Sequence, residues 1–382
     1  METKTDLLII GAGPFGLSLA AYVKYLGIDH VVAGRPMEFW KNNMPQGMYL
    51  RSASDWSLDP TNRFSILKYL ETLGKTPKDV EPLSRDFYLE YCQWFQNNSE
   101  IKTNPSYVKK VDQTSEGFRS VLENGEVIES KCVAVAIGMG YFKNQPSALT
   151  EILPSGKYQH TCDAVDLSGQ KGKRVLIIGG RQSAFEWAAL LNDEGATEVH
   201  LVHRHESPKF TESDWSWVPP LVDHMVEEPA WFRNLPQEEQ DVISRRMWGE
   251  GRLKVEPWLE KRVMKPNTHI HEKTGIAFCA ERADGALNVK LENGTSFIVD
   301  DIILATGYKV DLAQVPFLKN GNLLDKVEVK NGFPVLDPHF QTSAKGLYIT
   351  SMPAGQDFGP FFGFTVSVRT SAKIIGNALK EL

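Results

Sequence analysis

Apolar and polar positions follow two different periods near the start of the chain. Leu7–Ile10 is a short, continuous apolar run, which predicts a buried strand. A glycine-rich turn, Gly11–Gly16, comes next, and apolar residues then recur at helical spacing over Phe15–Leu26. Gly27 is placed to end this helix, and a second strand is expected at His30–Ala33. The pattern predicts a strand–helix–strand unit.

The same pattern recurs far downstream. An apolar run at Arg174–Ile178 leads through Gly179–Ala184 into a helical period over Ala184–Asn192. Gly195 follows this helix, and the next apolar strand is expected at Glu198–Val202. The chain therefore contains two predicted strand–helix–strand units, each with glycines at the first strand-to-helix turn.

Weaker patterns predict the remaining elements. Residues 206–264 have a mostly helical pattern and contain five of the nine tryptophans, including Trp215 and Trp217. We expect these two side chains to pack in a core or an oligomer contact, with a substrate entrance as the alternative. Outside this segment we expect helices at Phe64–Leu73, Arg85–Asn97 and Gly359–Leu379, and strands within Ser106–Lys131, Cys132–Ile137, Ile276–Arg282, Leu287–Leu291, Asp300–Leu304 and Gly346–Thr350.

Composition is that of a soluble globular protein. Of 382 residues, 42% are hydrophobic and 24% are charged, and no apolar run reaches the roughly 20 residues that span a bilayer. The net charge of −6 and the lack of a Lys/Arg stripe argue against a nucleic acid partner. The polar start of the chain predicts no signal peptide, so a cytoplasmic protein without membrane association is expected.

Cysteines and histidines predict no redox or metal chemistry of their own. The four cysteines, at 92, 132, 162 and 279, have no CxxC spacing, so we expect free thiols and exclude dithiol reductases. His203 and His205 flank Arg204 at the end of a predicted strand, and no metal site is predicted.

The first glycine turn has the spacing of a dinucleotide site. Gly11 permits the tight turn, Gly13 lets the backbone approach a diphosphate, and Gly16 lets helix and strand pack closely. Pro14 and Phe15 start the helix, whose N-terminus faces the phosphates. The acidic residue expected about 20 residues later is replaced by Arg35 and its neighbours. Arg35 could instead cover the adenine or contact a phosphate.

The second turn departs from the pattern at one position. Gly179 and Ala184 occupy the first and third small positions, whereas Arg181 stands where a glycine is expected. Its side chain either points out of the turn or lies over a diphosphate as a charge partner. Gln182 and Ser183 can cap the helix and donate to phosphate.

Two such turns in one chain indicate a flavin that is reduced by a nicotinamide cofactor. Arg204 follows the second strand, where an arginine can pair with a 2′-phosphate, which favours NADPH over NADH; the alternative is a solvated charge. We predict an α/β fold with two Rossmann-like dinucleotide-binding domains of the three-layer ββα type. The FAD-binding domain is expected at residues 1–168 and 300–382, and the NADPH-binding domain is inserted at 169–299 with the Trp-rich segment 206–264.

Other segments resemble the class B flavin-dependent monooxygenases. An Ala-Thr-Gly-Tyr sequence at Ala305–Tyr308 follows Asp300 and Asp301, as it does in that class. Pro154–His160 matches the FxGxxxH signature of the Baeyer–Villiger branch only at its glycine and histidine. The N-hydroxylating lysine and ornithine monooxygenases are closer in pattern: Met48–Leu70, Pro82–Trp94, Phe232–Glu239, Phe358-Gly359 and Ser367–Arg369 resemble their segments.

This resemblance implies an activity. NADPH would reduce FAD, O₂ would add at the flavin C4a, and the resulting hydroperoxide would pass one oxygen atom to a nucleophilic heteroatom of a small molecule, with nitrogen preferred. An NAD(P)H-dependent flavin reductase without oxygen transfer, a Baeyer–Villiger or sulfoxidising enzyme, and a non-enzymatic flavoprotein remain alternatives. A homo-oligomer is an open possibility.

The motifs also propose site residues. Arg51 could bind an anionic substrate group or the nicotinamide side of the flavin, or form a surface salt bridge. In the resembling family a lysine before the aspartate holds the carboxylate of the amino acid, and here Ser54 precedes Asp55. Catalytic candidates are Arg51, Ser54 and Asp55. Cofactor candidates are Gly11, Gly13, Pro14, Phe15, Gly16, Arg35, Trp40, Met48, Asp55, Gly138 and Gly359 for FAD, and Gly179, Arg181, Gln182, Ser183, Ala184, Arg204, Thr306, Gly307 and Tyr308 for NADPH.

Overall fold

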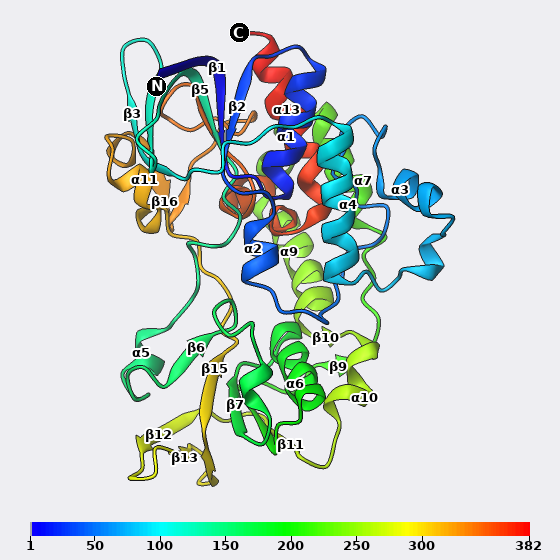
Figure 1. Cartoon of the computed structure of the whole chain (residues 1–382), viewed down its shortest axis with the longest axis vertical. Helices are drawn as coiled ribbons and strands as arrows, with labels where there is room; N and C mark the ends of the chain where they lie inside the picture. The colour runs from blue at the N-terminus through cyan, green and yellow to red at the C-terminus, as the bar shows by residue number, and fades with distance from the viewer. Residues whose placement is uncertain (1) are drawn as a thin grey trace.

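The computed structural model describes residues 2–382 and shows two main sheets, one in the upper and one in the lower half of Figure 1. The upper sheet has the order β2-β1-β5-β4-β3, with β18 also paired to β5. The four strands β2, β1, β5 and β18 run parallel, and β4 and β3 continue the sheet as an antiparallel hairpin. The bounds are β1 (Glu2–Ile10), β2 (His30–Ala33), β3 (Val108–Gln113), β4 (Phe118–Leu122), β5 (Val127–Val135) and β18 (Leu347–Ile349).

Two helices from opposite ends of the sequence pack together beside this sheet (Figure 1). They are α1 (Pro14–Tyr25) and α13 (Val368–Lys380), and the Tyr22 hydroxyl donates to Asn377 Oδ1 at 2.9 Å. Gly376 makes this contact possible, because a Cβ there would lie 2.5 Å from the Tyr22 ring. Further helices of this unit are α2 (Glu38–Asn42), α3 (Ile66–Leu73) and α4 (Arg85–Asn98).

The last predicted helix begins later than expected. Prediction places its start at Gly359, whereas Pro360–Gly363 and Thr365–Ser367 form 3₁₀ turns before α13. Proline and glycine disfavour a continuous helix here. Residues 360–367 therefore form an irregular segment before α13, and part of this segment lines the cavity described below.

The lower sheet is entirely parallel, with the order β11-β8-β7-β15-β6. Helix α6 (Gln182–Glu194) follows β7 and buries its apolar face against the sheet. A three-stranded antiparallel sheet, β12-β13-β14, is attached to this unit. The bounds are β6 (Tyr158–His160), β7 (Arg174–Ile178), β8 (Glu198–Val202), β11 (Thr268–His271), β12 (Ile276–Glu281), β13 (Leu287–Leu291), β14 (Ser296–Val299) and β15 (Asp301–Leu304).

Strand pairing differs from the predicted domain limits. The division at 168/169 and 299/300 assigns β6 and β15 to the first domain, but both strands pair within the lower sheet. Ile302 is in register with Leu176 of β7 on one side and with Tyr158 of β6 on the other. β15 has only four residues, three of them apolar, and is compatible with either sheet, so only tertiary contacts decide where it pairs.

The Trp-rich segment also packs differently from its predicted place. Helix α7 (Val218–Glu227) lies against α13, where the Thr370 hydroxyl donates to the Val222 carbonyl at 3.0 Å. Val218, Val222 and Phe232 belong to the hydrophobic core of the upper unit. Residues inserted with the lower sheet in sequence thus cover the upper unit in space. The remaining elements are α5 (Ser147–Thr150), α8 (Trp231–Asn234), α9 (Gln237–Arg252), α10 (Glu260–Val263), α11 (Pro316–Lys319), α12 (Gly355–Phe358), β9 (Lys209–Phe210), β10 (Lys254–Val255), β16 (Val329–Lys330) and β17 (Phe333–Pro334).

Within residues 2–382, no helix is both long enough and apolar enough to cross a membrane.

Candidate active site

The first glycine turn joins β1 to α1, and its three glycines have different surroundings. Gly11 has a φ of +112°, and a Cβ there would lie 2.4 Å from the Ala136 carbonyl oxygen. A Cβ on Gly16 would lie 1.9 Å from the Gly11 carbonyl oxygen. Gly13, in contrast, has extended backbone and nothing within 4 Å of its would-be Cβ. Two glycines therefore permit packing, and Gly13 leaves an open approach to the N-terminus of α1.

A cavity of about 410 Å³ lies over this turn. Its volume and its position at the N-terminus of α1 suit part of a dinucleotide. Arg35, in the wall, lies 5.1 Å from the centre of the Tyr107 ring and pairs with Glu38 at 2.9 Å. The predicted flavin residues that line the cavity are Gly11, Gly13, Pro14, Phe15, Arg35, Trp40 and Gly138.

Four predicted flavin residues lie outside the wall of this cavity. Gly16 packs within the turn, and Asp55 is exposed. Met48 packs against the core of the lower unit. Gly359 has a φ of +90° and a would-be Cβ 3.1 Å from the Phe232 ring, so it is needed for close packing. Motif likeness places these positions near the flavin, and their flavin contacts stay predictions.

The wall also contains residues that local patterns did not indicate. Ser351, Phe364 and Thr365 come from the C-terminal part of the chain. Ser351 follows β18 with a φ of +69°, a conformation that is uncommon for residues other than glycine. The Thr365 and Ser52 hydroxyl groups are hydrogen-bonded at 2.8 Å. These segments have no helical or strand period, so only their place in the fold reveals them.

The second glycine turn joins β7 to α6 and is more crowded. Gly179 has a φ of +145°, and its would-be Cβ lies 2.4 Å from the Ala305 carbonyl oxygen. A Cβ on Gly180 would lie 2.3 Å from the His203 ring. Ala184 is buried at the third small position. Gly179 is thus required by the backbone and Gly180 by the ring beside it.

Arg181 points out of the second turn toward α9. Its guanidinium donates to the Arg252 carbonyl and lies 5.0 Å from the centre of the Trp248 ring. Burial, followed by the nearby charge of Arg252, lowers the pKa of Arg181. Burial and the charge of Arg51 likewise lower the pKa of Arg252. The turn is therefore flanked by a group of arginines that repel one another.

The other predicted nicotinamide residues surround the start of α6. Gln182 Oε1 accepts a hydrogen bond from the Glu256 amide at 3.1 Å. Ser183 is exposed in the first turn of α6, and Arg204 is exposed just beyond β8. Parallel strands β7 and β8 place these residues at the same edge of the lower sheet.

The two segments that connect the sheets run side by side. The Asn144 amide donates to the Gly307 carbonyl at 2.9 Å, and the Lys309 amide donates to the Phe142 carbonyl at 2.7 Å. The Thr306 hydroxyl donates to the Asn144 carbonyl. Tyr308 lies edge-on to His160, with ring centres 5.3 Å apart. Thr306, Gly307 and Tyr308 therefore hold the connection between the two units.

Arg51 forms a buried ion pair. Its Nε donates to Glu256 Oε1 at 2.6 Å, and the two side chains are only 12% and 7% exposed. Its other nitrogens donate to the carbonyls of Gly251 and Glu250 and to the Ser213 hydroxyl. Arg51 is thus neither a free anion receptor nor a surface ion pair; it fastens the Met48–Leu70 segment to the end of α9.

Ser54 is buried and bound to an acid. Its hydroxyl and its amide both donate to Glu81 Oε1, at 2.6 and 2.9 Å. A serine held in this way presents no positive charge.

Glu186 was not singled out by any motif, yet it is buried where the two units meet. It lies on α6 and accepts a hydrogen bond from the Tyr49 amide at 3.1 Å. Burial raises its pKa to about 7. The carboxyl group therefore changes charge near neutral pH at a contact between the lower unit and the Met48–Leu70 segment.

Trp215 and Trp217 pack against the C-terminal segment of the upper unit. Trp215 lies 5.9 Å from Phe364, and Trp217 lies 6.1 Å from Phe361, between ring centres. Both border the upper core. Packing of this kind agrees with the core interpretation of these tryptophans.

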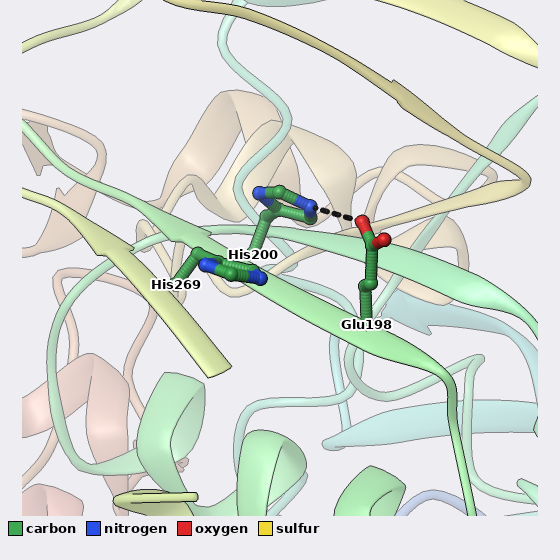
Figure 2. Close-up of side chains that lie close together, drawn as sticks. All are labelled: Glu198, His200 and His269. Atoms are coloured by element: carbon green, nitrogen blue, oxygen red, sulfur yellow. Dashed lines mark hydrogen bonds and ion pairs between the residues drawn. The ribbon is translucent and has the colours of Figure 1, made fainter. Parts of the chain in front are cut away.

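The cysteines are free and buried, as expected. Among the histidines, His200 and His269 gather with Glu198 on one face of the lower sheet (Figure 2). This group combines a Glu-x-His spacing on one strand with a histidine on its neighbour, and only the pairing of the strands reveals it.

Two glycine turns, each after a strand in the parallel part of its sheet, with a cavity over the first turn and hydrogen-bonded connections between the sheets, define a protein of the two-dinucleotide flavoprotein class. Residues 3–310 match the family described as L-lysine 6-monooxygenase/L-ornithine 5-monooxygenase. The chain belongs to this family of FAD- and NADPH-dependent monooxygenases, and the predicted class of enzyme is confirmed.

Other proteins are similar to this chain over nearly its full length. The probable indole-3-pyruvate monooxygenase YUCCA9 of Arabidopsis thaliana is 26% identical over 98% of this chain and 89% of its own. Ornithine hydroxylase PvdA from Pseudomonas aeruginosa superimposes with a TM-score of 0.78 at 17% identity, covering 99% of both chains. Ornithine N-hydroxylase KtzI of Kutzneria sp. 744 gives 0.80 at 15% identity, also over 99% of both. These structures confirm the predicted fold class.

Proposed function

We propose that this chain uses NADPH and O₂ to transfer one oxygen atom to the nitrogen of a small primary amine, with FAD as its flavin. The family match carries the oxygen transfer, and the cavity over the first turn, whose wall combines Gly13 with the segment around Thr365, supports a place for FAD. FAD supplies the redox chemistry when bound: it accepts hydride from NADPH and reacts with O₂.

The residues of the chain would hold the two cofactors at opposite turns. The open face of Gly13 lets a diphosphate reach the N-terminus of α1, where backbone N–H groups and the helix dipole favour negative charge. At the second turn, Ser183 and Gln182 would bind the NADPH diphosphate, and exposed Arg204 would pair with the 2′-phosphate. Arg181 and Arg252 would add positive charge beside them.

A buried histidine lies beside one of the two connections between the sheets. Burial lowers the pKa of His160, whose Nε2 lies 3.0 Å from the Gly307 carbonyl oxygen. This residue would stay neutral at physiological pH and serve to hold the connection.

Ser54 and Glu81 suggest the kind of amine. In the family that this chain resembles, a lysine at the position that corresponds to Ser54 binds the carboxylate of an amino acid. Here the Ser54 hydroxyl donates instead to the carboxylate of Glu81. We propose that the substrate carries no carboxylate at that end, as in a simple diamine. Transfer of one oxygen atom to the nitrogen of such an amine would yield a hydroxylamine.

The test is a comparison of amines with purified enzyme, NADPH and air. Putrescine, cadaverine, L-ornithine and L-lysine are each supplied, and hydroxylamine product is measured by mass spectrometry beside NADPH oxidised and H₂O₂ released. The proposal expects more product from a diamine than from the amino acid of the same chain length. NADPH oxidation that yields H₂O₂ and no oxygenated product from any of the four amines would favour the flavin reductase alternative.

A further inference from the structure

The lower sheet carries a compact group of metal-ligating side chains at its outer edge. Strands β8 and β11 are parallel neighbours, and β11 is the last strand of the sheet. Their register places His269 directly opposite His200, and Glu198 lies two residues before His200 on the same face. Figure 2 shows the two imidazole rings side by side, with the Glu198 carboxylate facing His200.

The three side chains are close enough to share one ion. His200 Nε2 lies 3.1 Å from Glu198 Oε2, and the ring centres of His200 and His269 are 4.8 Å apart. One ligating atom from each residue lies within 4.8 Å of the others. A tetrahedral zinc ion with ligand bonds of about 2.0–2.1 Å brings its ligand atoms to about 3.3 Å from one another. Small side-chain rotations of Glu198 and His269 would bring the ligand atoms from their present separation, within 4.8 Å, to the separation that zinc requires.

His200 is held rigidly at the centre of the group. It is buried, and its ring stacks on Phe297 of β14 with ring centres 4.0 Å apart and an interplanar angle of 7°. Its Nδ1 lies 3.1 Å from His271 Nε2. A metal-binding histidine commonly has its second ring nitrogen fixed by a hydrogen bond, which sets the ring orientation. His271 provides that bond here.

We propose that Glu198, His200 and His269 bind a divalent first-row transition-metal ion such as Zn²⁺. Two imidazoles and a carboxylate are a ligand set that such ions accept. The exposure of His269 leaves a side open for water to complete the coordination. The metal would lie between His200 Nε2 and Glu198 Oε2, and the one proton of the neutral His200 ring would then be on Nδ1, facing His271 Nε2.

This site is separate from the two dinucleotide turns. Glu198 begins β8, whereas the second glycine turn and Arg204 lie at the carboxyl ends of β7 and β8. Four steps of about 3.3 Å put roughly 13 Å between Glu198 and Val202, with His200 midway between them. The metal would instead join edge strand β11 to β8 and stabilise the folded chain by mass action.

The experiment measures zinc binding by tag-free protein that has been stripped with a chelator. Equilibrium dialysis against ZnCl₂, read by elemental mass spectrometry, is expected to give one saturable equivalent per chain. His269→Ala and Glu198→Gln are each expected to weaken binding at least about 10-fold, and His271→Ala about 10- to 100-fold. His339→Ala removes an exposed histidine elsewhere and is expected to bind zinc like the unmodified chain.

Thermal unfolding supplies an independent readout. Zinc is expected to raise the midpoint of the unmodified chain and of His339→Ala, but not that of His269→Ala. If His269→Ala does not fold, as judged by circular dichroism, His269→Gln takes its place. The proposal would be overturned if the unmodified chain bound no zinc saturably. It would also be overturned if the His269 and Glu198 variants bound zinc as tightly as the unmodified chain. Binding of Co²⁺ or Ni²⁺ in place of Zn²⁺ with the same loss in those variants would support it.

Discussion

The two glycine turns reach the same backbone shape with different residues at the same position. Gly13 and Arg181 each precede a helix, with φ values of −82° and −117° and extended ψ. Neither conformation requires glycine. Gly11 and Gly179, at the first position of each turn, have positive φ and no room for a Cβ. The glycine at the first motif position, Gly11 or Gly179, is thus required by the backbone. The residue at the next compared position, Gly13 or Arg181, affects how closely a ligand can approach the turn.

This difference explains how Arg181 is tolerated. Beside Gly13 the space is open and leads into the cavity, whereas the side chain of Arg181 leaves its turn and reaches α9. An arginine here costs no backbone strain and adds a positive charge near the expected phosphates. Departure from a glycine motif at this position therefore does not by itself indicate a lost cofactor site.

Substitution of the first turn should separate these two roles with the largest effects. Gly11→Ala forces a Cβ against the Ala136 carbonyl at a φ of +112°, and we expect a loss of about 3 kcal/mol or more in unfolding free energy. Gly13→Ala meets no neighbour, so stability should change by less than about 1 kcal/mol while FAD affinity falls. Urea unfolding of the apoprotein and FAD titration measure the two effects. Unchanged FAD affinity in Gly13→Ala would contradict an approach of the diphosphate at this residue.

The buried ion pair between Arg51 and Glu256 fastens a segment of the upper unit to the region of the second turn. Arg51→Ala leaves the Glu256 carboxylate buried without its partner, so we expect a loss of about 3–5 kcal/mol in unfolding free energy. Lys68→Ala, which breaks an exposed pair with Glu71, serves as the control and should change stability by less than about 1 kcal/mol. Similar losses in both variants, by urea unfolding, would show that burial of the Arg51 pair has no special role.

The pH dependence of the unfolding free energy tests the contact between Glu186 of the lower unit and the Tyr49 amide. The pKa of Glu186 is raised from 4.5 to about 7 in the folded chain, so its contribution to stability is complete below pH 4.5 and is lost as pH rises through 7. Glu186→Gln keeps an acceptor for the Tyr49 amide without this loss. We expect the unfolding free energy of the variant, relative to the unmodified chain, to rise by about 3 kcal/mol between pH 4.5 and 8.5. A difference that stays constant with pH would rule out the raised pKa.

Substitution of Arg181 should have the smallest effect, and this effect should be confined to NADPH binding. Arg181→Met removes a charge near the start of α6 while keeping much of the aliphatic chain. We expect NADPH affinity to fall about tenfold, or about 1.4 kcal/mol, with FAD affinity unchanged. Fluorescence titration of both cofactors measures this. Equal or higher NADPH affinity would mean that the arginine only intrudes on the turn.

Local patterns were sufficient for the elements that are built from short-range preferences. The limits of β7 and β8 are as predicted, and the glycines of both turns lie where the pattern places them. These segments combine a continuous apolar strand, a positive-φ glycine and a helical period within a few residues. Such features leave a clear mark on the sequence.

Long-range pairing was the part that sequence patterns could not supply. β15 is a short strand with three apolar residues, and its neighbours are determined by the sheet as a whole. Arg51 and Ser54 were singled out for ligands, yet their partners Glu256 and Glu81 lie far away in sequence or outside any motif. The same holds for the histidine group on β8 and β11, which only strand register brings together.

The central claim, that this chain transfers oxygen rather than only electrons, is tested most directly by rapid mixing. The flavin is reduced anaerobically with one equivalent of NADPH and then mixed with O₂, while absorbance spectra are recorded. The account predicts a transient species distinct from both reduced and oxidised flavin, which decays faster when a primary amine is present and yields hydroxylated amine. Direct return to oxidised flavin with stoichiometric H₂O₂, with or without amine, would contradict it.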